Sequence, residues 1–215
     1  VLLRTPPGGA QYLASAIDGT VIKKLVSGER SSSFESLRYL QTSLAWAPDN
    51  RLITFAAKVG GEDAIYLFDV EEKKVVRRLT FGLDGILSPS FSPDGDRLVF
   101  VGLDGGRSDL FLTDVEGQKL ERLTQDRFAD RDPTWSPDGR YIAFTTDRGP
   151  RTNFRTLEFG DFKIATYDLE SLAVLQSPGY RAIAGANLSP WSKRVTGKCR
   201  RICRFEAEQI LPGDR

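Results

Sequence analysis

Three stretches of the chain, residues 43–56, 88–101 and 132–145, share one pattern of apolar and polar positions. In each, an aromatic residue precedes Pro-Asp-Gly or Pro-Asp-Asn, the signature of a tight turn, and a short run of mainly apolar residues follows. Side chains of a strand alternate between its two faces, so both faces of these runs are apolar or small. We therefore expect sheets covered on both faces. One face carries Ile53, Phe55, Leu98, Phe100, Ile142 and Phe144, and the other Thr54, Val99 and Ala143.

Two further strands follow each of these stretches. In the second copy they are residues 109–114 and 119–124, joined by a Val-Glu-Gly-Gln turn. The four-strand unit recurs every 44 or 45 residues. A repeat of this length made of short strands predicts an all-β fold, a partial β-propeller of four-stranded antiparallel blades. The counterparts in the other copies are residues 64–69, 75–80 and 163–168, with a weaker run that ends near residue 176.

The repeat predicts three whole blades and parts of two more. Residues 11–25 align without a gap on residues 109–123, so they are the third and fourth strands of an earlier blade, and residues 1–10 read as a loop. Two insertions interrupt the pattern: residues 29–43, before the first strand of a blade, and residues 148–161, between a second and a third strand. The expected units are 1–43, 44–88, 89–132, 133–186 and 187–215.

The repeat fails near the end of the chain. Residues 187–192 open a further unit on schedule, but no spacer separates Pro190 from Trp191, and the strongly basic segment 193–204 follows. A reading-frame slip in the coding sequence and a genuine basic tail both explain this change. The chain begins with Val1 and contains no Met, so we expect a processed chain or a fragment. A propeller must close to protect its strand edges, which predicts that this chain is an arc of a longer protein.

The composition excludes several kinds of binding site and catalytic site. The formal net charge of +1 indicates no general polyanion partner such as nucleic acid. The chain has no histidine, which excludes Ser-His-Asp and Cys-His nucleophiles and histidine-bound metal sites, and it has no Gly-x-Ser-x-Gly elbow. No apolar run reaches the roughly 18 residues of a membrane helix. We expect no catalytic residue, no cofactor, no metal and no membrane insertion by this segment.

Acidic residues recur in the tight turns of the repeat. Asp49, Asp94 and Asp138 follow the turn prolines, where an aspartate side chain can accept hydrogen bonds from the turn backbone. We assign these three residues, together with Gly95 and Gly139, a structural role.

A second group of acidic residues precedes the first strands of the blades. Asp84, Asp130 and Asp132 lie in loops that open onto the central channel of a propeller. Two interpretations stay open: turn and cap roles, or a channel-mouth site that attracts a cation or a basic peptide. Arg127 and Arg131 beside them weaken the second.

Both insertions fall on one rim of the propeller, because the strands of a blade alternate in direction. The other rim carries only tight turns. Long loops in a compact fold are more often functional, and these combine arginine with aromatic residues, a composition that favours binding hot spots. The alternative is that they pack across the propeller top. The candidate partner-binding residues on this rim are Arg38, Tyr39, Asp84, Asp130, Arg131, Asp132, Arg151, Phe154, Arg155 and Phe159.

The run Trp-Ser-Pro-Asp-Gly-Arg-x-Ile-Ala-Phe-x-Thr-Asp-Arg at residues 135–148 resembles the WD-like repeats of TolB-type β-propellers. The resemblance covers residues 11–192 and is specific for the fold rather than the function. It implies a non-catalytic scaffold that binds a protein or peptide in the periplasm or cell envelope of a bacterium, beside the remaining blades or domains of the same protein. The alternative is the substrate-gating propeller of a prolyl oligopeptidase-like serine peptidase, with the catalytic domain outside this chain.

Overall fold

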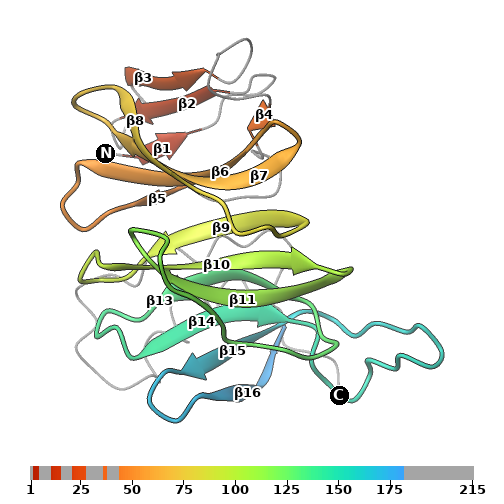
Figure 1. Ribbon diagram of the computed structural model, residues 1–215. Coiled ribbons are helices and arrows are strands. Elements are labelled where there is room, and N and C mark those ends of the chain that lie inside the picture. The colour runs from red at the N-terminus through yellow and green to blue at the C-terminus, as the bar shows by residue number, and fades with distance from the viewer. Residues whose placement is uncertain (1, 5–10, 16–20, 28–35, 38–43, 182–215) are drawn as a thin grey trace.

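The fold is all-β, as the repeat predicts. The computed structural model describes residues 2–4, 11–15, 21–27, 36–37 and 44–181, and every regular element in these residues is a β-strand (Figure 1). The strands form successive antiparallel sheets, stacked face to face as in a propeller (Figure 1). In the described residues, no helix has the length and apolar character needed to cross a membrane. The basic segment 193–204, and with it the proposed frame slip, lies outside the described residues.

Two complete four-stranded blades follow the predicted meander. One has the strand order β12-β11-β10-β9 and the next the order β13-β14-β15-β16. Their strands are β9 (Gly85–Phe91), β10 (Arg97–Asp104), β11 (Arg107–Asp114), β12 (Leu120–Arg122), β13 (Asp130–Trp135), β14 (Tyr141–Thr146), β15 (Lys163–Asp168) and β16 (Ala173–Arg181).

The preceding blade has an innermost strand in two pieces. Both β4 (Ser36–Leu37) and β5 (Ala45–Trp46) pair with β6 (Leu52–Val59), which continues through β7 (Glu62–Asp69) to β8 (Lys74–Leu79). We had expected residues 29–43 to be a single loop before the first strand, and β4 corrects this. The reason is that backbone pairing along the edge of β6 needs no particular side chains, so the Ser-Leu pair gave no sequence signal.

A three-stranded sheet of β1 (Leu2–Arg4), β2 (Gln11–Ser15) and β3 (Val21–Ser27) comes first in the chain. The strands β2 and β3 lie where the third and fourth strands of an earlier blade were expected. The expected loop at residues 1–10 is wrong at Leu2–Arg4, which pairs with β2. Three residues are too few to show the alternation that identifies a strand.

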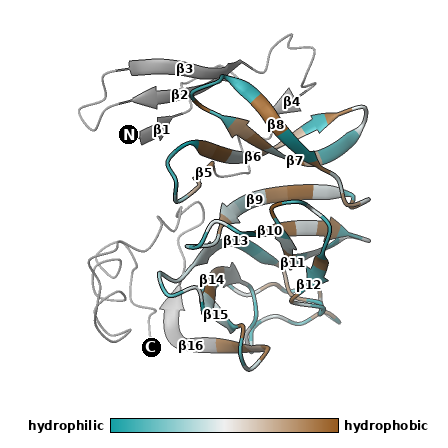
Figure 2. Cartoon of the chain, turned by 60° about the vertical axis from the view of Figure 1, so that its left-hand side comes forward, coloured by the Kyte–Doolittle hydropathy of each residue, from teal (hydrophilic) through white to brown (hydrophobic). Residues whose placement is uncertain are grey.

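The core lies between the sheets, and alternate residues of one strand serve two different interfaces. Figure 2 shows hydrophobic residues (brown) in strands β6, β9 and β10. In β10, Leu98 and Phe100 pack toward the preceding blade, whereas Val99 and Val101 pack toward the following one. All four are essentially inaccessible to solvent. Burying such a side chain is worth roughly 1.5–3 kcal/mol, so each blade depends on both neighbours for its stability.

A backbone hydrogen bond and an aspartate side chain close each tight turn. The amide nitrogens of Asn50, Gly95 and Gly139 donate hydrogen bonds to the carbonyl oxygens three residues earlier, each over 3.0 Å. All three residues have positive φ angles, 58°, 83° and 71°, which glycine adopts without strain and asparagine tolerates.

The three turn aspartates accept hydrogen bonds from the backbone that follows them. Asp94 accepts from the Asp96 amide over 3.1 Å, and Asp138 accepts from the Arg140 amide over 3.1 Å. Asp49 accepts from the Arg51 amide over 2.8 Å. These contacts pin the chain as it enters the second strand of each blade.

Candidate partner-binding site

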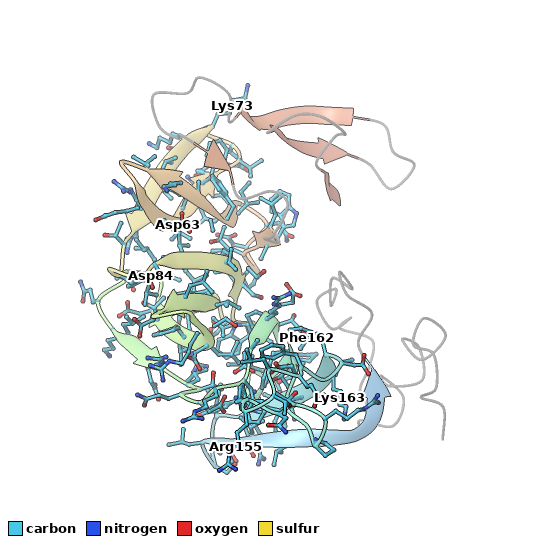
Figure 3. The ribbon with its side chains drawn as sticks, turned by 90° about the vertical axis from the view of Figure 1, so that its right-hand side faces the viewer. Asp63, Lys73, Asp84, Arg155, Phe162 and Lys163 are labelled. Carbon is cyan, nitrogen blue, oxygen red and sulfur yellow. The ribbon has the colours of Figure 1, made fainter. Side chains whose placement is uncertain are left out.

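One rim of the last complete blade carries a long loop where its neighbours have a two-residue turn. The β6–β7 and β10–β11 turns are pairs of glycines with positive φ angles, whereas residues 147–162 connect β14 to β15. Figure 3 looks onto this rim, with Asp84, Arg155, Phe162 and Lys163 labelled. We use the name blade-three rim for the 147–162 loop, the β12–β13 loop (residues 123–129) and the starts of β13 and β15.

The 147–162 loop has a defined internal structure. Asn153 and Glu158 form a β-bridge, with their amides and carbonyls joined over 2.8 and 3.1 Å. The Thr152 hydroxyl donates to the Asp147 carbonyl over 2.5 Å and accepts from the Gly160 amide over 2.9 Å. The loop is therefore a short hairpin, which we call the tip (residues 153–158), on a hydrogen-bonded base.

Arg148 anchors this base to the β12–β13 loop. Its guanidinium is buried and donates from both terminal nitrogens to Asp130, from Nη2 to Asp126 Oδ2 over 2.5 Å, and from Nη1 to Thr146 Oγ1 over 2.9 Å. It also lies 5.5 Å from the centre of the Phe128 ring. The ion pairs and the ring contact fix two loops that are far apart in the sequence as one unit.

Asp130 is the structural partner of Arg148 rather than a surface ligand. Its side chain is fully buried, so it cannot contact a partner, and this corrects its assignment to the binding surface. Burial raises the pKa of its carboxyl above the ordinary value, and the hydrogen bonds from Arg148 offset part of that rise. Sequence position alone does not show this burial, because it depends on a partner 18 residues later.

The other two channel-side aspartates hold local structure. Asp84 is exposed and accepts a hydrogen bond from the Gly105 amide over 2.8 Å, which caps the β10–β11 turn. Asp132 is half-buried and accepts from the Ser88 hydroxyl over 3.2 Å. Within the described residues, no group of three or more His, Cys, Asp and Glu side chains is placed to hold a metal ion. The Asp84 contact caps a turn, whereas the Asp132 contact joins two neighbouring blades.

An aromatic cluster supports the tip. Phe154 packs on Phe128 with ring centres 5.4 Å apart and on Phe159 with centres 6.4 Å apart. Phe159 nevertheless stays 64% exposed, and Leu157 at the tip is 71% exposed. The loop thus presents large apolar side chains to solvent on a rigid base. Sequence reasoning missed Phe128 and Leu157, since neither lies in a pattern that distinguishes it from an ordinary loop residue.

Three of the candidate arginines also lie on this rim. Arg151 is exposed and pairs with Asp161 over 3.5 Å, and the exposed Arg155 lies in the tip. The Arg131 guanidinium stacks over the ring of Phe162, 4.7 Å from its centre. The remaining two candidates, Arg38 and Tyr39, lie outside the described residues.

The fold and the sequence repeat are those of a β-propeller. Comparison with known proteins indicates which propellers this chain resembles. Residues 82–167 match the family model of the TolB β-propeller domain. No curated protein gives a significant sequence match.

Solved structures share the fold. The chain is similar to the putative TolB from Agrobacterium tumefaciens (25% identity, TM-score 0.51), with 61% of this chain and 47% of that one covered. It is also similar to TolB from Acinetobacter baumannii (22% identity, TM-score 0.58; 77% and 39% covered). The tricorn protease shares the fold at 19% identity and a TM-score of 0.53, with 76% of this chain and 14% of that one covered. The chain spans less than half the length of either TolB structure.

Proposed function

We propose that this chain is part of a non-catalytic TolB-like propeller that binds a protein or peptide in the bacterial cell envelope, and that the blade-three rim is the contact surface. One observation carries the proposal: a 16-residue ordered loop with exposed Phe159 and Leu157 replaces a turn that needs only two glycines in the neighbouring blades. The envelope location rests on the similarity to TolB.

The construction of the rim favours binding over simple packing. A loop that only covered the propeller top would bury its apolar side chains, but the two largest exposed ones project from it. Covering a Phe or Leu side chain is worth roughly 1.5–3 kcal/mol. Because the Arg148 anchor and the Asn153–Glu158 bridge already order the loop, a partner loses little affinity to loop ordering.

A crosslinking experiment tests the proposal. A photoreactive phenylalanine analogue at position 159 should crosslink one protein from a Gram-negative envelope extract, identified by mass spectrometry. The same analogue at position 120, in place of the exposed Leu120 of the outer strand β12, is the matched control. The purified partner should then fail to bind a tipless variant in which two glycines replace residues 153–158.

This variant retains Arg148 and its partners, so circular dichroism should show an unchanged fold. A partner that binds the folded tipless variant as well as the intact chain would contradict the proposal. The peptidase interpretation gains support in a different way: a Gly-x-Ser-x-Gly elbow elsewhere in the full-length gene would make this propeller the gate of a hydrolase.

A further inference from the structure

The carboxylates of the blade-three rim already have partners within the protein. Asp126 and Asp130 are held by Arg148, and Asp161 is held by Arg151. Asp132 accepts from Ser88, Asp147 accepts from the Ala129 amide over 2.8 Å, and Glu158 accepts from the Thr156 hydroxyl over 3.0 Å. A basic ligand would therefore have to displace existing contacts, which disfavours the basic peptide that the channel-side aspartates had suggested.

The cations of the same rim are differently placed. In the described part of the chain, Arg127, Arg131, Arg155 and Lys163 have no carboxylate within ion-pair distance, and the three arginines are exposed. Figure 3 shows Arg155 and Lys163 on this rim, with Phe162 beside the start of β15. The Arg131 guanidinium lies over the Phe162 ring, 4.7 Å from its centre. An arginine held over an aromatic ring can still use its N–H groups for bidentate pairing with a carboxylate.

We propose that the blade-three rim recognises an acidic peptide segment with an apolar residue between its carboxylates. The carboxylates pair with Arg131, Arg155 and Lys163, and the apolar residue packs on Phe159 and Leu157. This inference rests on the proposed function and adds the chemistry of the partner. A nucleic acid fits less well, because it has no aliphatic side chain that could pack on the exposed Leu157.

Fluorescence anisotropy with the full chain tests the inference. Three labelled ten-residue peptides share one central tryptophan and differ in the flanking residues: Glu and Asp, Lys and Arg, or Gln and Asn. We expect the acidic peptide to bind at least tenfold more tightly than the other two. An acidic peptide without the tryptophan should bind about five- to tenfold more weakly than the parent.

Surface variants locate the contact. The exposed positions make these substitutions compatible with folding, which circular dichroism checks. Arg131→Glu combined with Arg155→Glu should weaken binding of the acidic peptide at least tenfold, and Phe159→Ala about fivefold. Lys119→Glu is the matched control, because Lys119 is an exposed lysine in the β11–β12 turn on the opposite rim and should change binding less than twofold.

Each contrary result has a separate meaning. Equal binding of the three peptides, or equal loss in the rim variants and Lys119→Glu, overturns the acidic-peptide inference. Oligothymidylate that binds more tightly than the acidic peptide also overturns it, in favour of nucleic acid. If the peptide tests fail but position 159 still crosslinks an envelope protein that the tipless variant does not bind, the proposed function stands and only this inference fails. If that crosslink is also absent, both fail.

Discussion

The Ser88 hydroxyl donates a hydrogen bond to Asp132 Oδ1 over 3.2 Å, between two residues that occupy the same position in consecutive repeats. Both residues have a φ angle near +50° and precede a proline, and both lie where the pairing register of the innermost strand shifts. The bulge therefore serves two purposes. It turns each innermost strand, and it places one polar side chain from each blade in reach of the next.

Asp132 should make stability depend on pH in a defined direction. Burial raises the pKa of its carboxyl above its ordinary value, so the folded state disfavours the charged form at neutral pH. Asp132→Asn keeps the hydrogen-bond acceptor and tolerates positive φ, and should be as stable as the parent or more stable at pH 7. Asp132→Ala should lose about 1–2 kcal/mol, because it removes the hydrogen bond and strains the backbone.

The sign of the pH effect follows from linkage. A carboxyl with a raised folded-state pKa binds its proton more readily when folded, so the parent gains stability relative to Asp132→Asn as the pH falls through that pKa toward 3.8. Urea unfolding of both proteins between pH 7 and pH 3 measures this difference. An Asn variant whose advantage grows on acidification would contradict the assignment.

The repeat made the strands and turns predictable from sequence, because their determinants are local. Leu98, Val99 and Phe100 define two buried faces within three residues, and a Pro-Asp-Gly turn needs no distant partner. The site was less predictable because its determinants are not local. Burial of Asp130 requires Arg148, and the ordering of Phe154 requires Phe128 from another loop. The length of the insertion and its arginine and aromatic content single out this rim, but they do not show which of its residues are buried.

Removal of Arg148 should be among the most damaging single changes in the described part of the chain. Arg148→Ala leaves Asp130 buried and uncompensated, for which we expect a loss of roughly 3–5 kcal/mol. Arg148→Met combined with Asp130→Asn removes both charges and should cost less than Arg148→Ala alone. Urea unfolding measures each change, with the exposed Arg155→Ala as a control that shifts stability by less than about 0.5 kcal/mol.

A milder variant, Arg148→Lys, should loosen the loop before it unfolds the blade. Trypsin cleavage after Arg151 and Arg155 should accelerate in Arg148→Lys, which keeps the charge but not the two-nitrogen contact with Asp130. Unchanged cleavage in a folded Arg148→Lys protein would show that the Asn153–Glu158 bridge orders the loop without the anchor.

The serine of each Ser-Pro-Asp turn should lower the pKa of the aspartate two residues later. The Ser136 hydroxyl donates to Asp138 over 2.5 Å, accepts from the Tyr141 amide over 2.8 Å, and holds the pKa of the Asp138 carboxyl below its usual range. Ser136→Ala should raise that pKa toward 3.8 and cost about 1 kcal/mol. A carboxyl whose pKa is lowered in the folded state stabilises the fold at pH values above its ordinary pKa. This contribution to stability is lost as the pH falls through the folded-state pKa.

Carboxyl-detected NMR titration measures the Asp138 pKa directly. The blade that contains Asp49 is a natural comparison, because Ala47 stands where Ser136 does and Asp49 itself reaches the second amide, that of Leu52, over 3.2 Å. An Asp138 pKa that does not move in Ser136→Ala would show that the backbone amide of Arg140 alone sets it.

Two tryptophans at the same repeat position should differ in their value to stability. Trp135 Nε1 donates to the Ser90 carbonyl of the preceding blade over 3.2 Å, and the Arg97 guanidinium lies over its ring at 4.9 Å. Trp46 Nε1 is buried with no acceptor among the described residues. Trp135→Phe removes an interblade hydrogen bond, whereas Trp46→Phe removes a donor that makes no such bond.

We therefore expect Trp135→Phe to cost about 1–2 kcal/mol more than Trp46→Phe in urea unfolding at neutral pH. Arg97→Gln separates the two contributions to Trp135, because it removes the cation over the ring and leaves the hydrogen bond to Ser90. If the two Phe variants lose equal stability while Arg97→Gln has no effect, neither contact joins the blades. Stability would then come from apolar packing around Phe144 and Val99, which both tryptophan variants leave in place.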